Sequence, residues 1–231
     1  MRPRTIGLIS VLAFGLLAGP LLVEAQQDVT LLAAHFDADE DGFSYVDDPF
    51  RSTSEPIYTD GVRIAAGGFA GGALQVTLGG IDDADILGMS GGWQRSFSLS
   101  QPTDIVVSFR YNLTQASDYE SDELGQVLMS VDGILIGQAP DDYVAQIVGN
   151  GNGGVPETTG WRFFQVNLGT LPAGDHTLVI GGYSNKKTLN TEKQHEQAHS
   201  SGRPLDRRVY LDQRRFNRAV LLLASRGDCE R

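Results

Sequence analysis

Two runs of alternating apolar and polar residues, separated by an acidic loop, constrain the fold of this 231-residue chain most strongly. Residues 105–113 place an aliphatic or aromatic residue at every second position, and residues 125–132 alternate in the same way. A period of two puts the apolar side chains on one face of a β-sheet. The stretch from Asp104 to Gly137 therefore predicts a strand, a carboxylate-rich loop, and a second strand that ends in the turn Asp132-Gly133.

Further strand-like segments occur along the chain. They are residues 29–36, 73–78, 93–99, 143–148, 161–168 and 176–180. Glycine pairs and prolines separate these segments, and no helical period of useful length occurs before Asn185. Short strands without intervening helices predict an all-β fold, namely an antiparallel two-sheet sandwich or jelly roll.

The first 25 residues have the features of an export signal. A basic start precedes an apolar run over 6–23, and small residues follow at the spacing that a signal peptidase accepts. An uncleaved anchor is the alternative, but a span needs about 20 apolar residues, and this run is shorter and contains Pro20. We expect cleavage near Gln26, a secreted protein in an extracellular or periplasmic location, and no membrane insertion after cleavage.

Charge separates the chain into two parts. Residues 26–185 contain 22 acidic residues, five arginines and no lysine, whereas residues 186–231 contain 11 basic and six acidic residues. The acidic part disfavours nucleic acid and anionic membranes and favours cations or neutral partners, although it equally suits solubility in salt. Cys229 is the only cysteine, so no internal disulfide can form and the core or a metal must hold the fold.

Four segments together resemble a known type of module. They are FDADEDGFSYVDDPF at 36–50, SGGWQRSFSLS at 90–100, FRYNLTQASDYESDE at 109–123, and TTGWRFFQVNLGTLPAGDHTLVIGGYSNKKT at 158–188. This set is similar to the concanavalin A-like or MAM-like jelly-roll modules of secreted bacterial surface proteins. The resemblance covers residues 29–188 and implies a sandwich whose relatives include lectins, glycanases and adhesion spacers.

The resemblance also implies a last strand with a paired acidic motif after 188, and the chain departs from it there. Residues 189–231 are basic and polar, with one apolar run over 219–224. One interpretation is a disordered or helical tail. The other is a shifted reading frame, since permitted codons for 207–216 encode an acidic strand-like sequence when the first base is dropped. On both, the jelly-roll domain comprises residues 26–188. If the reading frame is shifted, the sandwich lacks its last strand and exposes a sheet edge.

A carboxylate cluster at the start of the domain predicts a calcium site. Asp37, Asp39 and Asp41 followed by Gly42 match the front of a calcium loop, D-x-D-x-D-G, with Asp48 at the twelfth position. Calcium prefers several oxygen ligands, and glycine permits the sharp turn. The flanks are strand-like and the twelfth residue is not glutamate, so a solvated acidic turn is the alternative.

The sequence predicts no catalytic residues. Two glycine-containing motifs, at 88–92 and 149–154, lack the helix that a nucleophile elbow or a pyrophosphate site requires. Jelly-roll glycanases align carboxylates on alternate strand residues, as in E-x-D-x-E. Glu120 and Asp122 keep this alternation, but Leu124 replaces the third carboxylate.

Polar and aromatic loop residues instead predict a sugar-binding surface, because sugars bind aromatic faces beside hydrogen-bonding side chains. The candidate ligand residues are Tyr119, Glu120, Asp122, Tyr143, Asn150, Asn152, Tyr183 and Asn185. Trp93 and Trp161 are assigned to the core. We therefore expect a non-catalytic, calcium-stabilised carbohydrate-binding or adhesion module whose partner is a polysaccharide or cell-surface glycan. The alternatives are a glycoside hydrolase or lyase of the same fold, and a structural spacer of a larger surface protein.

Overall fold

The computed structural model describes residues 30–79, 88–117, 119–151, 155–185 and 219–224. The predicted signal peptide, Asn152 and most of the basic tail lie outside these residues. The chain divides into two units between Leu31 and Leu32, and every strand belongs to the second unit. Within the described residues, no helix has the length and apolar character needed to cross a bilayer.

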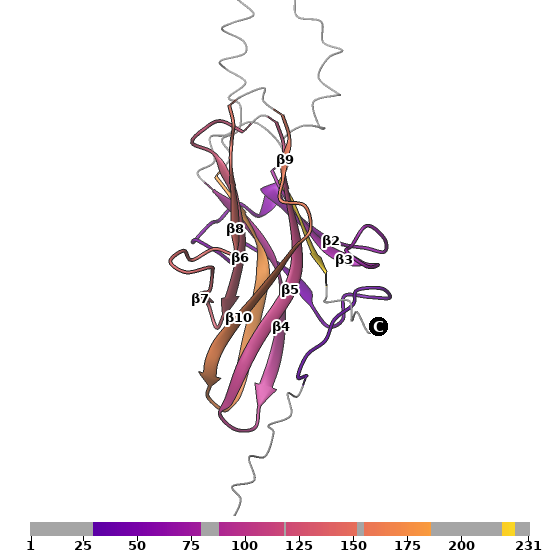
Figure 1. Cartoon of the computed structure of the whole chain (residues 1–231), viewed down its shortest axis with the longest axis vertical. Coiled ribbons are helices and arrows are strands. Elements are labelled where there is room, and N and C mark those ends of the chain that lie inside the picture. The colour runs from indigo at the N-terminus through magenta and orange to yellow at the C-terminus, as the bar shows by residue number, and fades with distance from the viewer. Residues whose placement is uncertain (1–29, 80–87, 118, 152–154, 186–218, 225–231) are drawn as a thin grey trace, which may run out of the picture. The chain divides into compact units, whose positions relative to one another are not determined.

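One sheet, sheet A, has the strand order β1-β4-β11-β6, and both β7 and β8 pair with β6. All of these pairings are antiparallel (Figure 1). Its strands are β1 (Ser44–Asp47), β4 (Met89–Leu99), β6 (Leu124–Val131), β7 (Ile134–Leu135), β8 (Ala145–Val148) and β11 (Gly174–Ser184).

The second sheet, sheet B, has the order β10-β5-β12-β3-β2, and β9 pairs with β5. These pairings are also antiparallel. Its strands are β2 (Thr59–Ile64), β3 (Ala73–Leu78), β5 (Thr103–Gln115), β9 (Glu157–Thr158), β10 (Arg162–Leu171) and β12 (Ala219–Ala224). A short 3-10 helix, η1 (Pro56–Tyr58), precedes β2. The predicted all-β antiparallel fold is confirmed.

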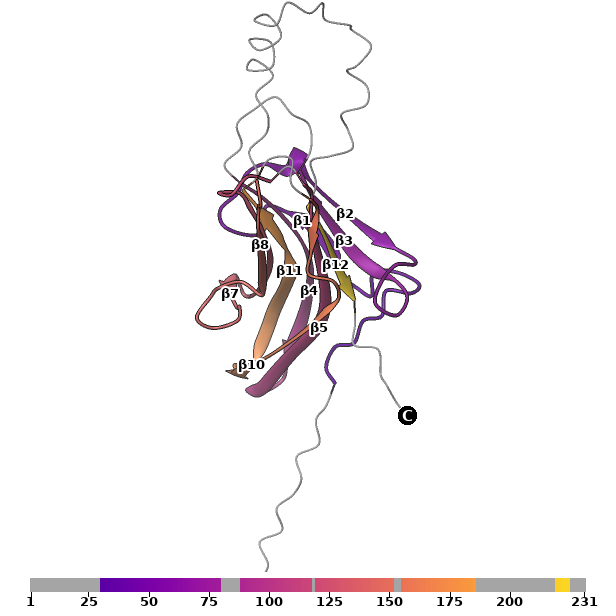
Figure 2. The same cartoon turned by 45° about the horizontal axis from the view of Figure 1, so that its top comes forward.

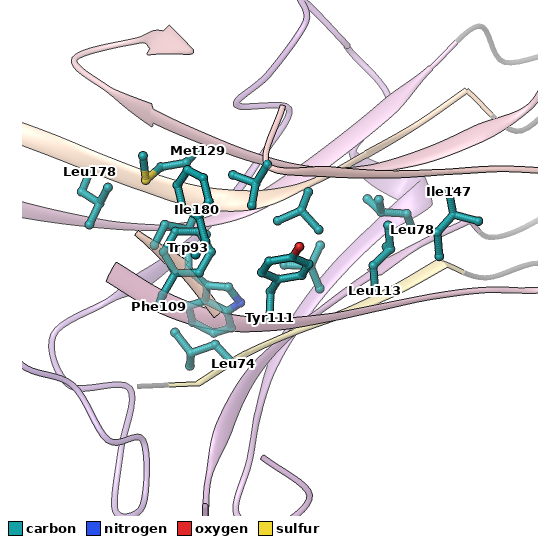
Figure 3. Close-up of a cluster of buried hydrophobic side chains, with 14 of the residues drawn as sticks. Leu74, Leu78, Trp93, Phe109, Tyr111, Leu113, Met129, Ile147, Leu178 and Ile180 are labelled. Atoms are coloured by element: carbon teal, nitrogen blue, oxygen red, sulfur yellow. The ribbon is translucent and has the colours of Figure 1, made fainter. Parts of the chain in front are cut away.

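The two sheets bury one apolar core between them. Figure 3 shows side chains from both sheets pointing toward one another, among them Trp93, Met129 and Ile180 from sheet A and Phe109 and Leu113 from sheet B. The core position predicted for Trp93 is confirmed, and its indole N–H donates a hydrogen bond to a main-chain carbonyl of β3 at 3.1 Å. Alternation along β5 explains this arrangement, since every second residue from Ile105 faces the core.

The strand predicted at the start of the domain was wrong. Residues 30–36 do not form a strand, because the main-chain N–H groups of His35 and Phe36 donate to the Asp41 carboxylate and Phe36 adopts a left-handed φ of 61°. Conversely, β2 forms where no strand was predicted. Its apolar residues are few and Gly61 interrupts them, so periodicity gave no signal there.

The largest difference from the sequence prediction is β12. The frame-shift interpretation implied a sandwich without its last strand, but residues 219–224 lie between β3 and β5 and pair with both (Figure 2). The run AVLLLA places an apolar residue at every second position, as a strand beside the buried residues of β3 and β5 requires. Residues 219–224 are therefore part of sheet B. The prediction of a disordered or frame-shifted tail covered residues 189–231, of which 189–218 and 225–231 lie outside the described residues.

Candidate functional site

The outer face of sheet B, which points away from sheet A, carries a mixed row of side chains along β5. Ile105, Phe109 and Leu113 are buried, so the residues between them face outward. These outward residues are Val106, Ser108, Arg110, Asn112 and Thr114. Phe163 of β10 lies directly opposite Arg110 in the register. A charged, an aromatic and several polar side chains thus share one face.

Arg110 is the centre of an aromatic cluster that we call the Arg110 cluster, which consists of Phe69, Arg110, Trp161 and Phe163. The guanidinium carbon lies 3.8 Å from the centroid of the Phe69 ring and 5.5 Å from that of Phe163. The Phe69 and Trp161 rings meet edge to face, with centroids 6.1 Å apart. A cation over a ring face is attracted by the negative charge of that face, which holds the cluster together.

The Arg110 cluster is open to solvent. Phe69 and Phe163 are each 43% exposed, and Trp161 is half-buried. Within the described residues, the buried Nε atom of Arg110 has no hydrogen-bond partner. The cluster therefore offers partly exposed rings around a guanidinium that is not fully hydrogen-bonded. Large exposed apolar groups that are gathered in one place characterise binding surfaces.

A glycine-rich loop between β2 and β3 positions Phe69. The loop closes through a hydrogen bond from Gly68 N–H to the Gly71 carbonyl at 2.9 Å. Gly72 N–H donates to Asp37 Oδ1 at 3.0 Å, which ties the loop to the segment before β1. A methyl group at Gly72 would lie 1.9 Å from the Phe36 carbonyl oxygen, so this approach requires glycine. Phe69 is therefore held on an anchored loop.

Hydroxyl and amide groups continue the face beyond the Arg110 cluster. The Thr158 hydroxyl donates to Asn112 Oδ1 at 2.9 Å, and the Thr114 hydroxyl donates to Thr158 Oγ1 at 3.1 Å. These residues belong to β5 and β9, which fix their positions through main-chain pairing. The face thus combines aromatic rings with aligned hydrogen-bonding groups, a composition suited to hydroxyl-rich ligands.

Sequence reasoning missed this site because it placed Trp161 in the core. Trp161 precedes β10 rather than lying within it, and its ring meets Phe69 on the outer face. The sequence did contain one indication of the site. Arg110 occupies an outward-facing position in the regular alternation of β5, which places its charge on the outer face of the sheet. The proximity of Phe69 to Arg110 depends on a loop 41 residues earlier in the chain, so no local sequence pattern indicated it.

Tyr119 does not have the position that its predicted role requires. Its side chain is 1% exposed, and its hydroxyl lies 3.1 Å from Ser184 Oγ in the interior. A buried ring has no face to offer a sugar, so the prediction of Tyr119 as a ligand residue is corrected to a structural one. Glu120 is exposed beside it, and its N–H donates to the carboxylate of the buried Glu123 at 2.9 Å.

Other predicted residues gather at this same end of the sandwich, where they hold loops together. Asn185 accepts a hydrogen bond from Leu124 N–H at 2.6 Å and donates to the Asp122 carbonyl at 3.1 Å. Asn150 donates to Glu157 Oε1 at 2.7 Å and to the Val155 carbonyl at 3.1 Å. The amides of Asn150 and Asn185 thus bind neighbouring backbone and side chains.

Tyr143 and Tyr183 lie on the opposite surface, the outer face of sheet A. Both pack against a small cluster formed by Phe50, Leu128 and Val179. Arg51 contacts both Tyr183 and Asp142, the residue before Tyr143. Its guanidinium carbon is 5.4 Å from the Tyr183 ring centroid, and two of its nitrogens contact the Asp142 carboxylate at 2.7 and 3.2 Å. The predicted ligand residues are therefore divided between this face and the loop end, and do not form one surface.

The predicted calcium ligands are used in hydrogen bonds to the backbone. Asp39 Oδ1 accepts from Asp41 N–H at 2.8 Å, and Asp41 Oδ2 accepts from Phe36 N–H at 2.6 Å. The hydrogen bond from Phe36 N–H is the main reason that the pKa of Asp41 lies below its ordinary value. Asp48 follows β1, whereas the other three aspartates precede it. Its carboxylate accepts a hydrogen bond from Glu55 N–H at 3.0 Å.

Strand β1 therefore separates Asp48 from Asp37, Asp39 and Asp41, whereas the prediction placed all four in one continuous loop of twelve residues. Among the residues that the structure describes, no group of three or more histidine, cysteine, aspartate or glutamate side chains is arranged to hold a metal ion. Calcium binding stays a prediction for the three carboxylates that precede β1.

Comparisons with known proteins add no family to these observations. No protein-family model matches the chain, and no curated protein matches it.

Proposed function

We propose that this chain is a secreted, non-catalytic carbohydrate-binding module of the concanavalin A-like or MAM-like jelly-roll type, and that the Arg110 cluster is its sugar-binding surface. The observation that carries the proposal is the group of partly exposed rings of Phe69, Trp161 and Phe163 around Arg110 on one sheet face. Its partner is a polysaccharide or a cell-surface glycan.

The chemistry of sugars favours this surface over the other candidate positions. A pyranose ring has an apolar side of C–H groups, which packs on an aromatic face, and a rim of hydroxyls, which need donors and acceptors. The cluster supplies the rings, and Asn112, Thr114 and Thr158 supply the polar groups next to them. The guanidinium of Arg110 lies against the rings of Phe69 and Phe163 at the centre.

The scaffold supports binding without a large rearrangement. Arg110 of β5 and Phe163, near the start of β10, are directly paired, and the Phe69 loop is anchored by Asp37. Side chains held by strands lose little conformational freedom when a ligand binds, which favours affinity. The proposal includes stabilisation by calcium near Asp37, which would tighten the same anchor.

Retention on insoluble polysaccharides tests the proposal. The wild-type chain should bind at least one of cellulose, chitin, xylan and β-glucan, and Trp161→Ala or Phe163→Ala should weaken that binding by about tenfold, the loss expected for one aromatic contact. Val106→Ala is the matched control, because Val106 is 56% exposed on the same face of β5 but outside the cluster.

Two outcomes would count against the proposal. Failure of the wild-type chain to bind any of the four polysaccharides would leave the spacer alternative. Unchanged binding by Trp161→Ala, combined with a loss in Glu120→Ala, would move the sugar site to the loop end of the sandwich. Circular dichroism of each variant should match the wild type, since every substituted side chain except that of the half-buried Trp161 is exposed.

A further inference from the structure

Strand β12 is the only link between two parts of sheet B within the described residues. It pairs with β3 over residues 219–223 and with β5 over residues 219–224, and β3 and β5 do not pair with each other. Figure 2 shows β12, in yellow, alongside β3. Without it, β2–β3 and β5–β10 would face each other across a gap that we call the strand slot, with unpaired main-chain groups on both sides.

The sides of the strand slot require an apolar strand. Leu221 is opposite Val76 on β3 and Leu113 on β5, and both of these partners are fully buried. Leu223 is likewise opposite two buried residues, Leu74 and Tyr111. Residues directly opposite in a sheet share a face, so alternate positions of any strand in the slot face the core. The sequence AVLLLA at 219–224 meets that requirement.

The strand in the slot is far along the chain from the rest of the domain. Strand β11 ends at Ser184, and residues 186–218 precede β12. A link of this length can extend over about 110 Å. The advantage of an intramolecular strand falls as its link lengthens, so a strand from another molecule competes at high concentration.

We propose that the strand slot accepts residues 219–224 from a second copy of this chain, which gives a dimer in which two molecules exchange β12. The second copy is the partner because its own segment already fits both edges in register. A reciprocal exchange fills both slots and closes the dimer. Charge favours the same partner, since the segment after 185 carries 11 basic residues and the domain before it carries 22 acidic ones.

Disulfide trapping across the slot tests this proposal. Gln75 and Leu222 are direct partners in the register, so Gln75→Cys with Leu222→Cys places two cysteines at bridging distance, in a full-length chain that also carries Cys229→Ser. After refolding and oxidation, we expect a crosslinked monomer at low protein concentration. A covalent dimer, resolved on a non-reducing gel, should increase as the concentration during refolding rises.

Two controls keep the result decisive. Each single-cysteine chain gives the level of random crosslinking, and Asn112→Cys with Leu222→Cys tests the same strand from the β5 side. Crosslinked monomer alone at every concentration would overturn strand exchange. Absence of any specific crosslink in both double variants, in chains with the circular dichroism of the wild type, would overturn the slot itself.

Discussion

His176 shows how much one buried polar residue can depend on its neighbours. Its side chain is 5% exposed, and its Nδ1 lies 2.7 Å from Asp132 Oδ2 while its Nε2 lies 3.0 Å from the Pro172 carbonyl. An imidazole with an acceptor at each nitrogen needs a proton on both. The hydrogen bond with Asp132 raises the pKa of His176, and the same bond lowers the pKa of Asp132.

These directions predict how stability depends on pH. Because the folded pKa of His176 is raised, its contribution is complete below the unfolded value of about 6.5 and is lost as the pH rises through the folded value. Because the folded pKa of Asp132 is lowered, its contribution is lost as the pH falls through that lower value. Urea unfolding of the wild type should therefore show stability that declines as the pH rises above about 6.5.

Asp132→Asn should be less stable than the wild type, because the amide cannot stabilise the imidazolium. Its free energy of unfolding should also lack most of the decline with rising pH. His35→Gln is the control, since the His35 side chain lies outside this pair, and it should keep the wild-type dependence. Identical pH profiles for the wild type and Asp132→Asn would contradict the assignment of a protonated His176.

At the scale of a single strand, β2 shows why an edge needs a small residue. Gly61 is opposite Val76 in the register, and the Tyr45 ring of β1 lies directly over it. A methyl group at Gly61 would lie 2.0 Å from Cδ2 of Tyr45, which is far inside contact distance. The edge strand can approach the core only because position 61 has no side chain.

Gly61→Ala should therefore destabilise the domain by about 1–3 kcal/mol, the usual cost of overpacking. The matched control is Val62→Ala at the next position, where the side chain is 45% exposed and the change should be within about 0.5 kcal/mol. Denaturant unfolding of both variants measures the two values. Equal stability of Gly61→Ala and the wild type would show that Tyr45 can move at no cost.

At the scale of the whole molecule, charge opposes folding of the domain. Residues 26–185 combine 22 acidic residues with five arginines, and like charges repel more strongly when the chain is compact. Salt screens this repulsion over a Debye length of about 8–10 Å. A cation bound by Asp37, Asp39 or Asp41 would act in addition, because it binds the folded state alone.

The melting temperature should consequently rise with sodium chloride, and rise further with millimolar calcium chloride at matched ionic strength. The additional rise in melting temperature caused by calcium should disappear when a chelator is added, and it should be absent in Asp39→Asn. A calcium effect that sodium chloride reproduces at equal ionic strength would remove calcium from the proposed function. It would leave the screening prediction intact.

Much of the fold follows from local pattern. The period of two in β5 and β6, together with the glycine-rich separators, predicts strands and excludes long helices, because alternation depends only on neighbouring residues. The turn at Asp132-Gly133 is also local: Asp132 has a φ of 53° and Gly133 a φ of 79°, values that this residue pair adopts readily. The all-β class was therefore determined by the sequence alone.

Strand order, burial and the candidate site depended on tertiary structure, because they require contacts between residues far apart in the chain. The residues around Tyr119 have the composition of a surface loop, yet packing against Ser184 buries the Tyr119 side chain. Phe69 reaches Arg110 and Trp161 only when sheet B forms. Residues 219–224 have the apolar character of a strand in isolation, but only the gap between β3 and β5 decides where that strand lies.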